Sequence, residues 1–118
     1  MNEISDLQHA LRTFRDERDW AQFHHPKDLA LALSIEASEL LECYLWKSSE
    51  QADLNAVKEE LADVFAYALM LADQYDLDVK QIVLEKMAKN AVKYPVEQAK
   101  GSAEKYTELP SFPPKGLK

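Results

Sequence analysis

Two acidic pairs in this sequence have the residue types and the spacing that could bind a metal ion. The first pair is Glu36 and Glu39, and the second pair is Glu60 and Asp63. Because residues three apart lie one turn apart on a helix, each pair presents two carboxylates on one helix face. No cysteine and histidine ligand set lies close by, and carboxylate oxygens suit a hard divalent cation. The spacing therefore predicts a site for Mg²⁺, with Mn²⁺ as the alternative, held by these four acids.

Both pairs lie in stretches that are too apolar for an ordinary surface helix. Residues 29–46 read LALALSIEASELLECYLW, and residues 57–72 read VKEELADVFAYALMLA. An ionised carboxylate in apolar surroundings is costly unless a positive charge compensates it. Few basic residues lie nearby in the sequence, so a bound cation is the simplest source of that charge. The alternative is that the acids face solvent, as most charged side chains do.

Aromatic residues follow both acidic pairs at helical spacing. Trp46 lies seven residues after Glu39, and Tyr67 lies four residues after Asp63, so each ring shares the helix face of an acidic pair. A cation beside a flat aromatic surface suggests a ligand that has phosphates at one end and a base at the other.

A short aromatic link, residues 20–28, precedes the first acidic pair. It contains Trp20, Phe23 and His24. These rings either form a lid that stacks over a base or close the end of a helix bundle, since aromatic side chains are common core anchors. Pro26 then opens the next helix, where its missing N–H costs nothing.

The charge balance bears on the class of ligand. The chain has 21 acidic and 14 basic residues and a net charge of −7, which argues against sequence-independent binding of nucleic acid. A small anionic substrate would need the cation and local lysines. Lys86, Asn90 and Lys93 follow one edge of a predicted helix and either face solvent or hold phosphate oxygens.

Cysteine content and hydropathy indicate the compartment. Cys43 is the single cysteine, so an intrachain disulfide is excluded and a reducing compartment is expected. The N-terminal segment lacks the charged and apolar regions of a secretory signal. No apolar run reaches the roughly 18–20 residues that cross a bilayer. We therefore expect a cytoplasmic protein without membrane contact.

The distribution of helix-breaking residues predicts an all-α fold. Both glycines and four of the five prolines occur at position 95 or later, so Pro26 is the only earlier breaker. We expect one domain over 1–100, followed by an extended or disordered tail over 101–118. The middle two helices are apolar on two sides, which predicts a four-helix bundle-like subunit that assembles into a homodimer or homotetramer. The predicted helices span about 5–18, 26–46 and 79–92, with a third helix that is capped by Ser49 or Asp53 and extends to about 74.

Several short motifs, taken in order, resemble those of the MazG-like, all-α nucleoside triphosphate pyrophosphohydrolases. The family's metal motif, Glu-x-x-Glu followed by Glu-x-x-Asp, matches the two acidic pairs. The similarity extends from about Leu7 to Leu109 and is greatest with the dCTP pyrophosphatase branch. The other matching motifs are ERDW at 17–20, FH at 23–24, WK at 46–47, KM-x-x-N at 86–90, YP at 94–95 and KYTEL at 105–109.

The resemblance implies a chemistry and a site. It implies Mg²⁺-dependent cleavage of a (d)NTP, dCTP or a related dNTP, to (d)NMP and pyrophosphate, as house-cleaning of the nucleotide pool. It implies helical dimers or dimers of dimers. Animal members of the branch carry a histidine near the base where this chain has Leu11, so base choice carries over less directly than the chemistry. The implied substrate-binding residues are Trp20, Phe23, His24, Trp46, Lys47, Tyr67, Lys86, Asn90 and Lys93.

The expected mechanism is attack by water on the α-phosphorus. Glu36 or Glu39 is expected to accept the proton of that water, which makes these two the predicted catalytic residues. A ferritin-like di-iron bundle is disfavoured because the Glu-x-x-His signature is missing. The remaining alternative is a non-catalytic acidic helical scaffold that binds a partner protein. A thermal shift with Mg²⁺ and nucleotide separates the two, because only the enzyme gains stability.

Overall fold

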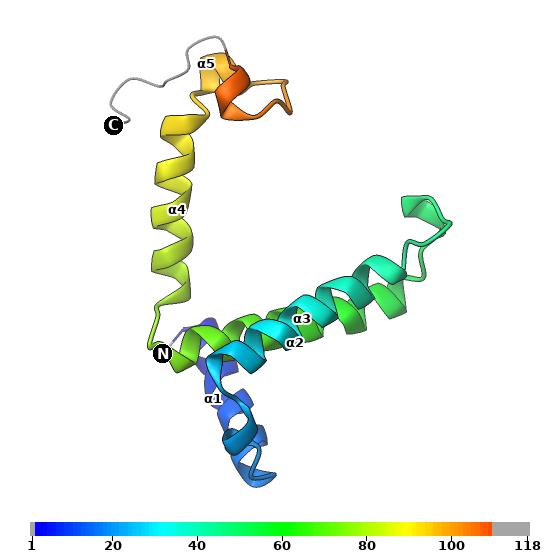
Figure 1. The fold of residues 1–118 in the computed structure, drawn as a ribbon, viewed down its shortest axis with the longest axis vertical. Coiled ribbons are helices and arrows are strands. Elements are labelled where there is room, and N and C mark those ends of the chain that lie inside the picture. Colours follow the sequence, from blue (N-terminus) through cyan, green and yellow to red (C-terminus); the bar gives the residue numbers. More distant parts are fainter. Residues whose placement is uncertain (1, 110–118) are drawn as a thin grey trace. The chain divides into compact units, whose positions relative to one another are not determined.

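The structure is a computed structural model that describes residues 2–109. Across these residues every regular element is helical, which confirms the predicted all-α class. The chain divides into two compact units, Met1–Leu77 and Asp78–Lys118. The first unit contains α1 (Glu3–Glu17), α2 (Pro26–Glu42) and α3 (Leu54–Gln74), with short 3-10 helices at Ala21–Phe23 and Ser49–Gln51 (Figure 1).

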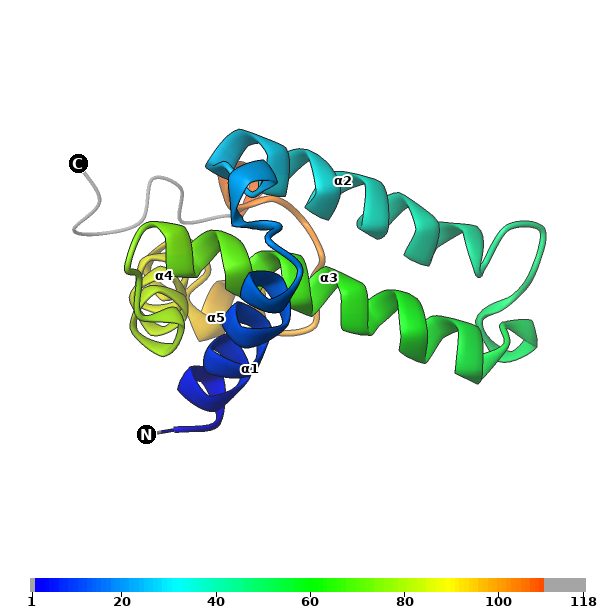
Figure 2. The same ribbon diagram turned by 90° about the horizontal axis from the view of Figure 1, so that it is seen from below.

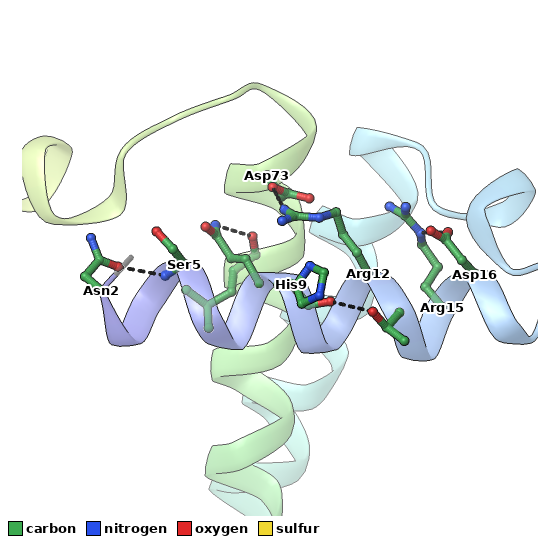
Figure 3. A network of polar contacts seen from close by, with 10 residues as sticks. Asn2, Ser5, His9, Arg12, Arg15, Asp16 and Asp73 are labelled. Atoms are coloured by element: carbon green, nitrogen blue, oxygen red, sulfur yellow. Dashed lines mark hydrogen bonds and ion pairs between the residues drawn. The ribbon is translucent and has the colours of Figure 1, made fainter.

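Polar caps explain where the helices begin. The Asn2 side chain accepts a hydrogen bond from the backbone N–H of Ser5 at 2.7 Å, so α1 begins before Ser5 (Figure 3). Pro26 occupies the first turn of α2, as its fixed φ allows. The Asp53 side chain caps α3 by accepting from the N–H of Asn55 at 3.0 Å.

The end of α2 differs from the sequence prediction. The helix ends at Glu42, and the next residues form tighter turns in which Tyr44 N–H donates to Leu41 O at 2.9 Å. Trp46 has a φ of 60°, in the left-handed region, and this conformation cannot continue a right-handed helix. Trp46 therefore lies beyond α2, not on its acidic face.

Two aspartates also have a positive φ, and each follows the C-terminal end of a helix. Asp19 (φ 55°) follows α1, and Asp76 (φ 52°) follows α3. In each turn the next residue reaches back to the helix: Trp20 N–H donates to Arg15 O at 3.0 Å, and Leu77 N–H donates to Ala72 O at 3.0 Å. This is the Schellman pattern, which usually places glycine at the left-handed position.

The first unit is a helical hairpin crossed by a third helix. Figures 1 and 2 show α2 and α3 side by side and antiparallel, joined at one end by residues 43–53. Helix α1 crosses the C-terminal part of α3, where Gln8 Nε2 donates to Leu69 O at 3.2 Å. Arg12 of α1 forms an ion pair with Asp73 of α3 at 2.5 Å (Figure 3). The antiparallel pairing brings the two acidic pairs of the sequence to the same region.

The buried core of this unit is small. Leu29 of α2 and Leu69 and Ala72 of α3 are its buried apolar residues among those described. Many large apolar side chains stay exposed, with Phe65 61% exposed on α3. An open apolar groove of 450 Å³ runs along α3, lined by Leu54, Val57, Lys58, Leu61, Ala62 and Phe65. Apolar residues that gather on one exposed face can mark a surface for protein contact.

The second unit contains α4 (Val79–Lys93), α5 (Val96–Ala99) and a 3-10 helix at Tyr106–Glu108. Asp78 caps α4 by accepting from Gln81 N–H at 3.0 Å. The four-helix arrangement, the division at residue 100 and the assembly stay predictions. Of the predicted tail 101–118, residues 110–118 lie outside the described part. No helix in the described part is long and apolar enough to span a membrane.

Candidate functional site

Three acidic side chains from two helices converge within the first unit. They are Glu36 of α2 and Glu60 and Asp63 of α3. One carboxylate oxygen from each lies within 4.8 Å of the others. Glu36 and Glu60 are half-buried, whereas Asp63 is exposed. These distances allow a single ion to contact all three residues.

Glu39 is linked to this cluster because it contributes to the raised pKa values of neighbouring acids. A hydrogen bond with Glu39, together with burial and the surrounding carboxylates, raises the pKa of Glu36 to about 7. Burial and the charge of Glu39 also raise the pKa of Glu60. Burial and crowded carboxylates both disfavour the charged form of an acid, so both contribute to the raised pKa values.

Two buried carboxylate oxygens indicate whether a cation fits the acidic cluster. Oε2 of Glu36 and Oε2 of Glu60 are both buried, and neither has a hydrogen-bond partner in the described part of the chain. Buried polar atoms are nearly always satisfied, so two unsatisfied carboxylate oxygens in one cluster are unusual. A hard divalent cation would satisfy both atoms and offset their repulsion, and oxygen donors of this type are the ones it prefers. The donor set therefore fits Mg²⁺ or Mn²⁺.

A cavity of 280 Å³ lies beside the acidic cluster. Asp63 belongs to both, since its side chain is in the cluster and also lines the cavity. A ligand in the cavity could thus reach the acids without leaving the aromatic surface. The cavity is slightly smaller than typical small-molecule sites, which begin at about 300 Å³. Its lining consists of Leu11, Phe14, Arg15, Trp20, His24, Asp63, Ala66, Tyr67 and Met70.

Rings form much of the cavity wall. Phe14 and Trp20 meet edge to face, with ring centroids 5.9 Å apart and an interplanar angle of 69°. Burial and the nearby acids, chiefly Glu36, raise the pKa of Tyr67. This wall would offer stacking surface to a flat ligand, with the acidic cluster at one side.

His24 contributes an unsatisfied polar atom to the same cavity. Its Nδ1 is buried and has no hydrogen-bond partner among the described residues. Burial and the positive charge of Arg15 lower the pKa of His24, which favours the neutral ring. A neutral ring with one unpaired nitrogen can exchange a hydrogen bond with the polar edge of a ligand.

The structure also places lining residues that the sequence analysis did not propose as ligands. Two of these residues are Phe14 and Arg15 of α1. Both line the cavity, as does Leu11, where the resemblance pointed to the base. Their spacing, i, i+3 and i+4 on α1, could have marked one helix face. The same spacing is typical of a core face, however, so the pattern alone identifies no ligand site.

Other predicted substrate-binding residues do not line this cavity within the first unit. The Phe23 side chain is 62% exposed and Trp46 is 100% exposed. Trp46 and Lys47 lie in the connection between α2 and α3, at the end of the hairpin away from α1 (Figure 2). Lys86, Asn90 and Lys93 lie on α4, in the second unit. The roles of all these residues stay predictions.

Comparison with known proteins gives a consistent result. The model of the MazG-like family matches residues 31–109. The chain is 41% identical to mouse dCTP pyrophosphatase 1 over 115 residues, covering 91% of this chain and 68% of that protein. The human protein of the same name is 39% identical over the same share of each chain.

A solved structure agrees in fold as well as in sequence. The crystal structure of a pyrophosphatase from Archaeoglobus fulgidus matches with a TM-score of 0.75 and 40% sequence identity. The match covers 80% of this chain and 94% of that chain. With the family model spanning most of the chain and relatives at this level of identity, the chain belongs to the MazG-like family.

Proposed function

We infer that this protein is a nucleotide pyrophosphohydrolase that cleaves a deoxynucleoside triphosphate to the monophosphate and pyrophosphate. The observation that carries the inference is that Asp63 belongs both to the acidic cluster and to the aromatic cavity. A triphosphate and a base need those two environments side by side. The relatives named dCTP pyrophosphatase 1 support dCTP, or a related dNTP, as the substrate.

The acids are proposed to hold Mg²⁺, with Mn²⁺ as the alternative. Glu36, Glu60 and Asp63 would be the direct ligands, and Glu39 would complete the set. When bound, the ion would neutralise phosphate charge and lower the pKa of a coordinated water. The unsatisfied Oε2 atoms of Glu36 and Glu60 support these assignments.

Glu36 or Glu39 is proposed to accept the proton of the attacking water. Glu36, whose pKa is raised to about 7 chiefly by its interaction with Glu39, can hold or release a proton near neutral pH. Water attacks the α-phosphorus, its proton passes to a carboxylate oxygen of this pair, and pyrophosphate leaves. No side-chain nucleophile is needed for this reaction.

The cavity is proposed to hold the base. Trp20 and Tyr67 would flank its faces, and the edge of the base would supply His24 Nδ1 with the hydrogen bond that it lacks within residues 2–109. Phe23, Trp46 and Lys47 are proposed to complete the site. Lys86, Asn90 and Lys93 of α4 are proposed to hold the β- and γ-phosphates, for which a mobile lysine charge is suited.

We also propose that the chain forms a homodimer or homotetramer. The exposed apolar groove on α3 supports this, because water contact with Leu61 and Phe65 is unfavourable. The lone cysteine supports a cytoplasmic location. A non-catalytic scaffold remains the alternative that the apolar surface would also suit. A scaffold would show no pyrophosphate release and no thermal shift with Mg²⁺ and nucleotide.

The proposed function is tested with a panel of dNTPs and rNTPs and detection of pyrophosphate. The parent should release pyrophosphate from dCTP or a related dNTP only when Mg²⁺ or Mn²⁺ is present. Asp63→Asn keeps the shape and removes the charge at the junction of cluster and cavity, so its activity should fall about 10-fold or more. Glu42→Gln, an exposed acid at the C-terminal end of α2, the other helix of the hairpin, is the matched control. Asp63→Asn activity within about threefold of the parent would contradict a metal role for this residue.

A further inference from the structure

Arg18 lies at the C-terminal end of α1, directly behind the aromatic wall of the cavity. Its guanidinium carbon lies 3.6 Å from the centroid of the Phe14 ring and 6.0 Å from the Trp20 ring. Its Nη1 donates to the backbone carbonyl of Phe14 at 2.9 Å. The side chain therefore contacts both the backbone and the ring of the residue one turn earlier.

The two rings need such support because the protein interior does not hold them. Phe14 is 49% exposed and Trp20 is 43% exposed, yet both line the cavity. The turn at Asp19 and the bond from Trp20 N–H to Arg15 O orient the backbone of Trp20. They leave the side-chain torsions of Trp20 open, and its indole ring meets Phe14 edge to face.

Arg18 is directed to these rings and not to an acid. Among the described residues the ion pairs of α1 involve Arg12 with Asp73 and Arg15 with Asp16. Arg18 does not line the cavity itself. A planar guanidinium stacks on an aromatic face, whereas the compact ammonium of lysine does not, so the residue type matters here.

We propose that Arg18 is a positioning residue that holds Phe14 and Trp20 at the angle needed to receive the nucleobase. The proposal rests on the proposed function, because it assigns the wall to the base. Arg18 would act through the two rings without touching the substrate. Its loss should weaken recognition of the base and leave the handling of the phosphates unchanged.

The first experiment compares steady-state kinetics of Arg18→Met and the parent with dCTP and Mg²⁺. Methionine keeps an apolar stem and removes the stacked cation. We expect KM to rise about threefold with little change in kcat, because the lost contact serves binding and not the chemical step. Arg18→Lys should recover only part of the loss. Arg12→Met is the matched control: it removes another arginine of α1, lowers the Tm through its ion pair with Asp73, and should leave KM unchanged.

Two further measurements separate a positioning role from the alternatives. Inorganic tripolyphosphate lacks a base, so its inhibition constant should be the same for Arg18→Met and the parent. In a Phe14→Leu background, which removes the ring that Arg18 and Trp20 both contact, Arg18→Met should cause no further rise in KM. A weaker inhibition by tripolyphosphate would instead indicate direct contact with phosphates. Either that result or a full Arg18→Met effect without the Phe14 ring would overturn the proposal.

A spectroscopic readout does not depend on activity. Trp46→Phe leaves Trp20 as the only tryptophan, since the chain has two. In the near-ultraviolet circular dichroism of this variant, the long-wavelength tryptophan band, beyond the absorption of the five tyrosines, then reports the order of the Trp20 ring, and we expect Arg18→Met to reduce this band. An unchanged signal would overturn the proposal. If the parent cleaves no nucleotide while the signal still depends on Arg18, the proposed function fails and the ring-holding role remains.

Discussion

At the scale of single residues, the acidic cluster is expected to lower the stability of the metal-free protein. Glu36 and Glu60 each bury an oxygen without a partner among residues 2–109, and neighbouring carboxylates and burial together raise both pKa values, with burial the larger cause for Glu60. Such local conflicts are expected at functional sites, where binding of a ligand relieves them. The cost should therefore be visible in the metal-free protein and should disappear when a divalent ion binds.

Neutralising one acid of the cluster should stabilise the metal-free protein and abolish its response to metal. We expect Glu60→Gln to have a higher Tm than the parent without divalent ions, because repulsion is removed. Added Mg²⁺ should raise the Tm of the parent and leave that of Glu60→Gln nearly unchanged. Differential scanning calorimetry with and without millimolar Mg²⁺ measures both effects. An equal Mg²⁺ response in parent and variant would exclude Glu60 as a ligand.

The pKa of Glu36 predicts how stability depends on pH. The folded-state pKa of about 7 is higher than the ordinary value of 4.5, so the folded state binds more protons between these pH values. The stability from protonated Glu36 is fully present below pH 4.5 and is lost as pH rises through about 7. Relative to Glu36→Gln, the metal-free parent should therefore lose stability over this window, while its stabilisation by Mg²⁺ should grow. Urea unfolding of both proteins at several pH values measures the difference, and parallel curves would contradict the raised pKa.

At the scale of elements, the turns that end α1 and α3 matter as much as the helices. Both use an aspartate with positive φ where glycine is preferred. The first turn sends the chain from α1 to Trp20, and so places a ring in the cavity wall. The antiparallel pairing of α2 and α3 (Figure 2) positions the acids, because it brings Glu36 close to Glu60 and Asp63.

Relief of a left-handed conformation should stabilise the first unit. Asp76 has a φ of 52°, so Asp76→Gly should increase the free energy of unfolding by about 1 kcal/mol. Ala10→Gly places the same residue inside α1, where it should decrease that free energy by about 1 kcal/mol. Urea unfolding measures both changes. A destabilised Asp76→Gly would mean that the aspartate side chain does more for the turn than its conformation costs.

At the scale of the whole molecule, a single chain leaves many large apolar side chains exposed to water. The α3 groove has 450 Å³ of open apolar volume, and Phe65 is 61% exposed within it. Helices that are apolar on two sides need a second layer. We interpret this groove as the surface that a second copy covers.

Charge placed in the groove should prevent assembly. We expect the parent to be a dimer or tetramer and Phe65→Glu to shift the mass toward the monomer, because the new carboxylate would be buried in the interface. Lys58→Glu changes charge at an exposed lining position and should have the smaller effect. Size-exclusion chromatography with light scattering gives the masses. A monomeric parent would contradict the assembly.

Local signals in the sequence account for much of the fold. Apolar periodicity, Pro26 at the start of α2 and the scarcity of glycine were enough to predict the four longer helices, α1 to α4, whereas the short α5 was not predicted. The end of α2 was predicted too late, because apolar periodicity continued through Trp46 while its backbone adopted a positive φ. The MazG-like resemblance, which the family match confirms, also came from short local motifs.

The helical class, the family and the spacing of the acids could be predicted from local patterns, because these depend on neighbours one or two turns away. The packing of the helices was needed to show that Asp63 joins the acidic cluster to a cavity, that Phe14 and Arg15 line this cavity, and that Trp46 does not. Such contacts depend on which helix faces meet. A pattern along one helix identifies its apolar face but not the helix that packs against that face.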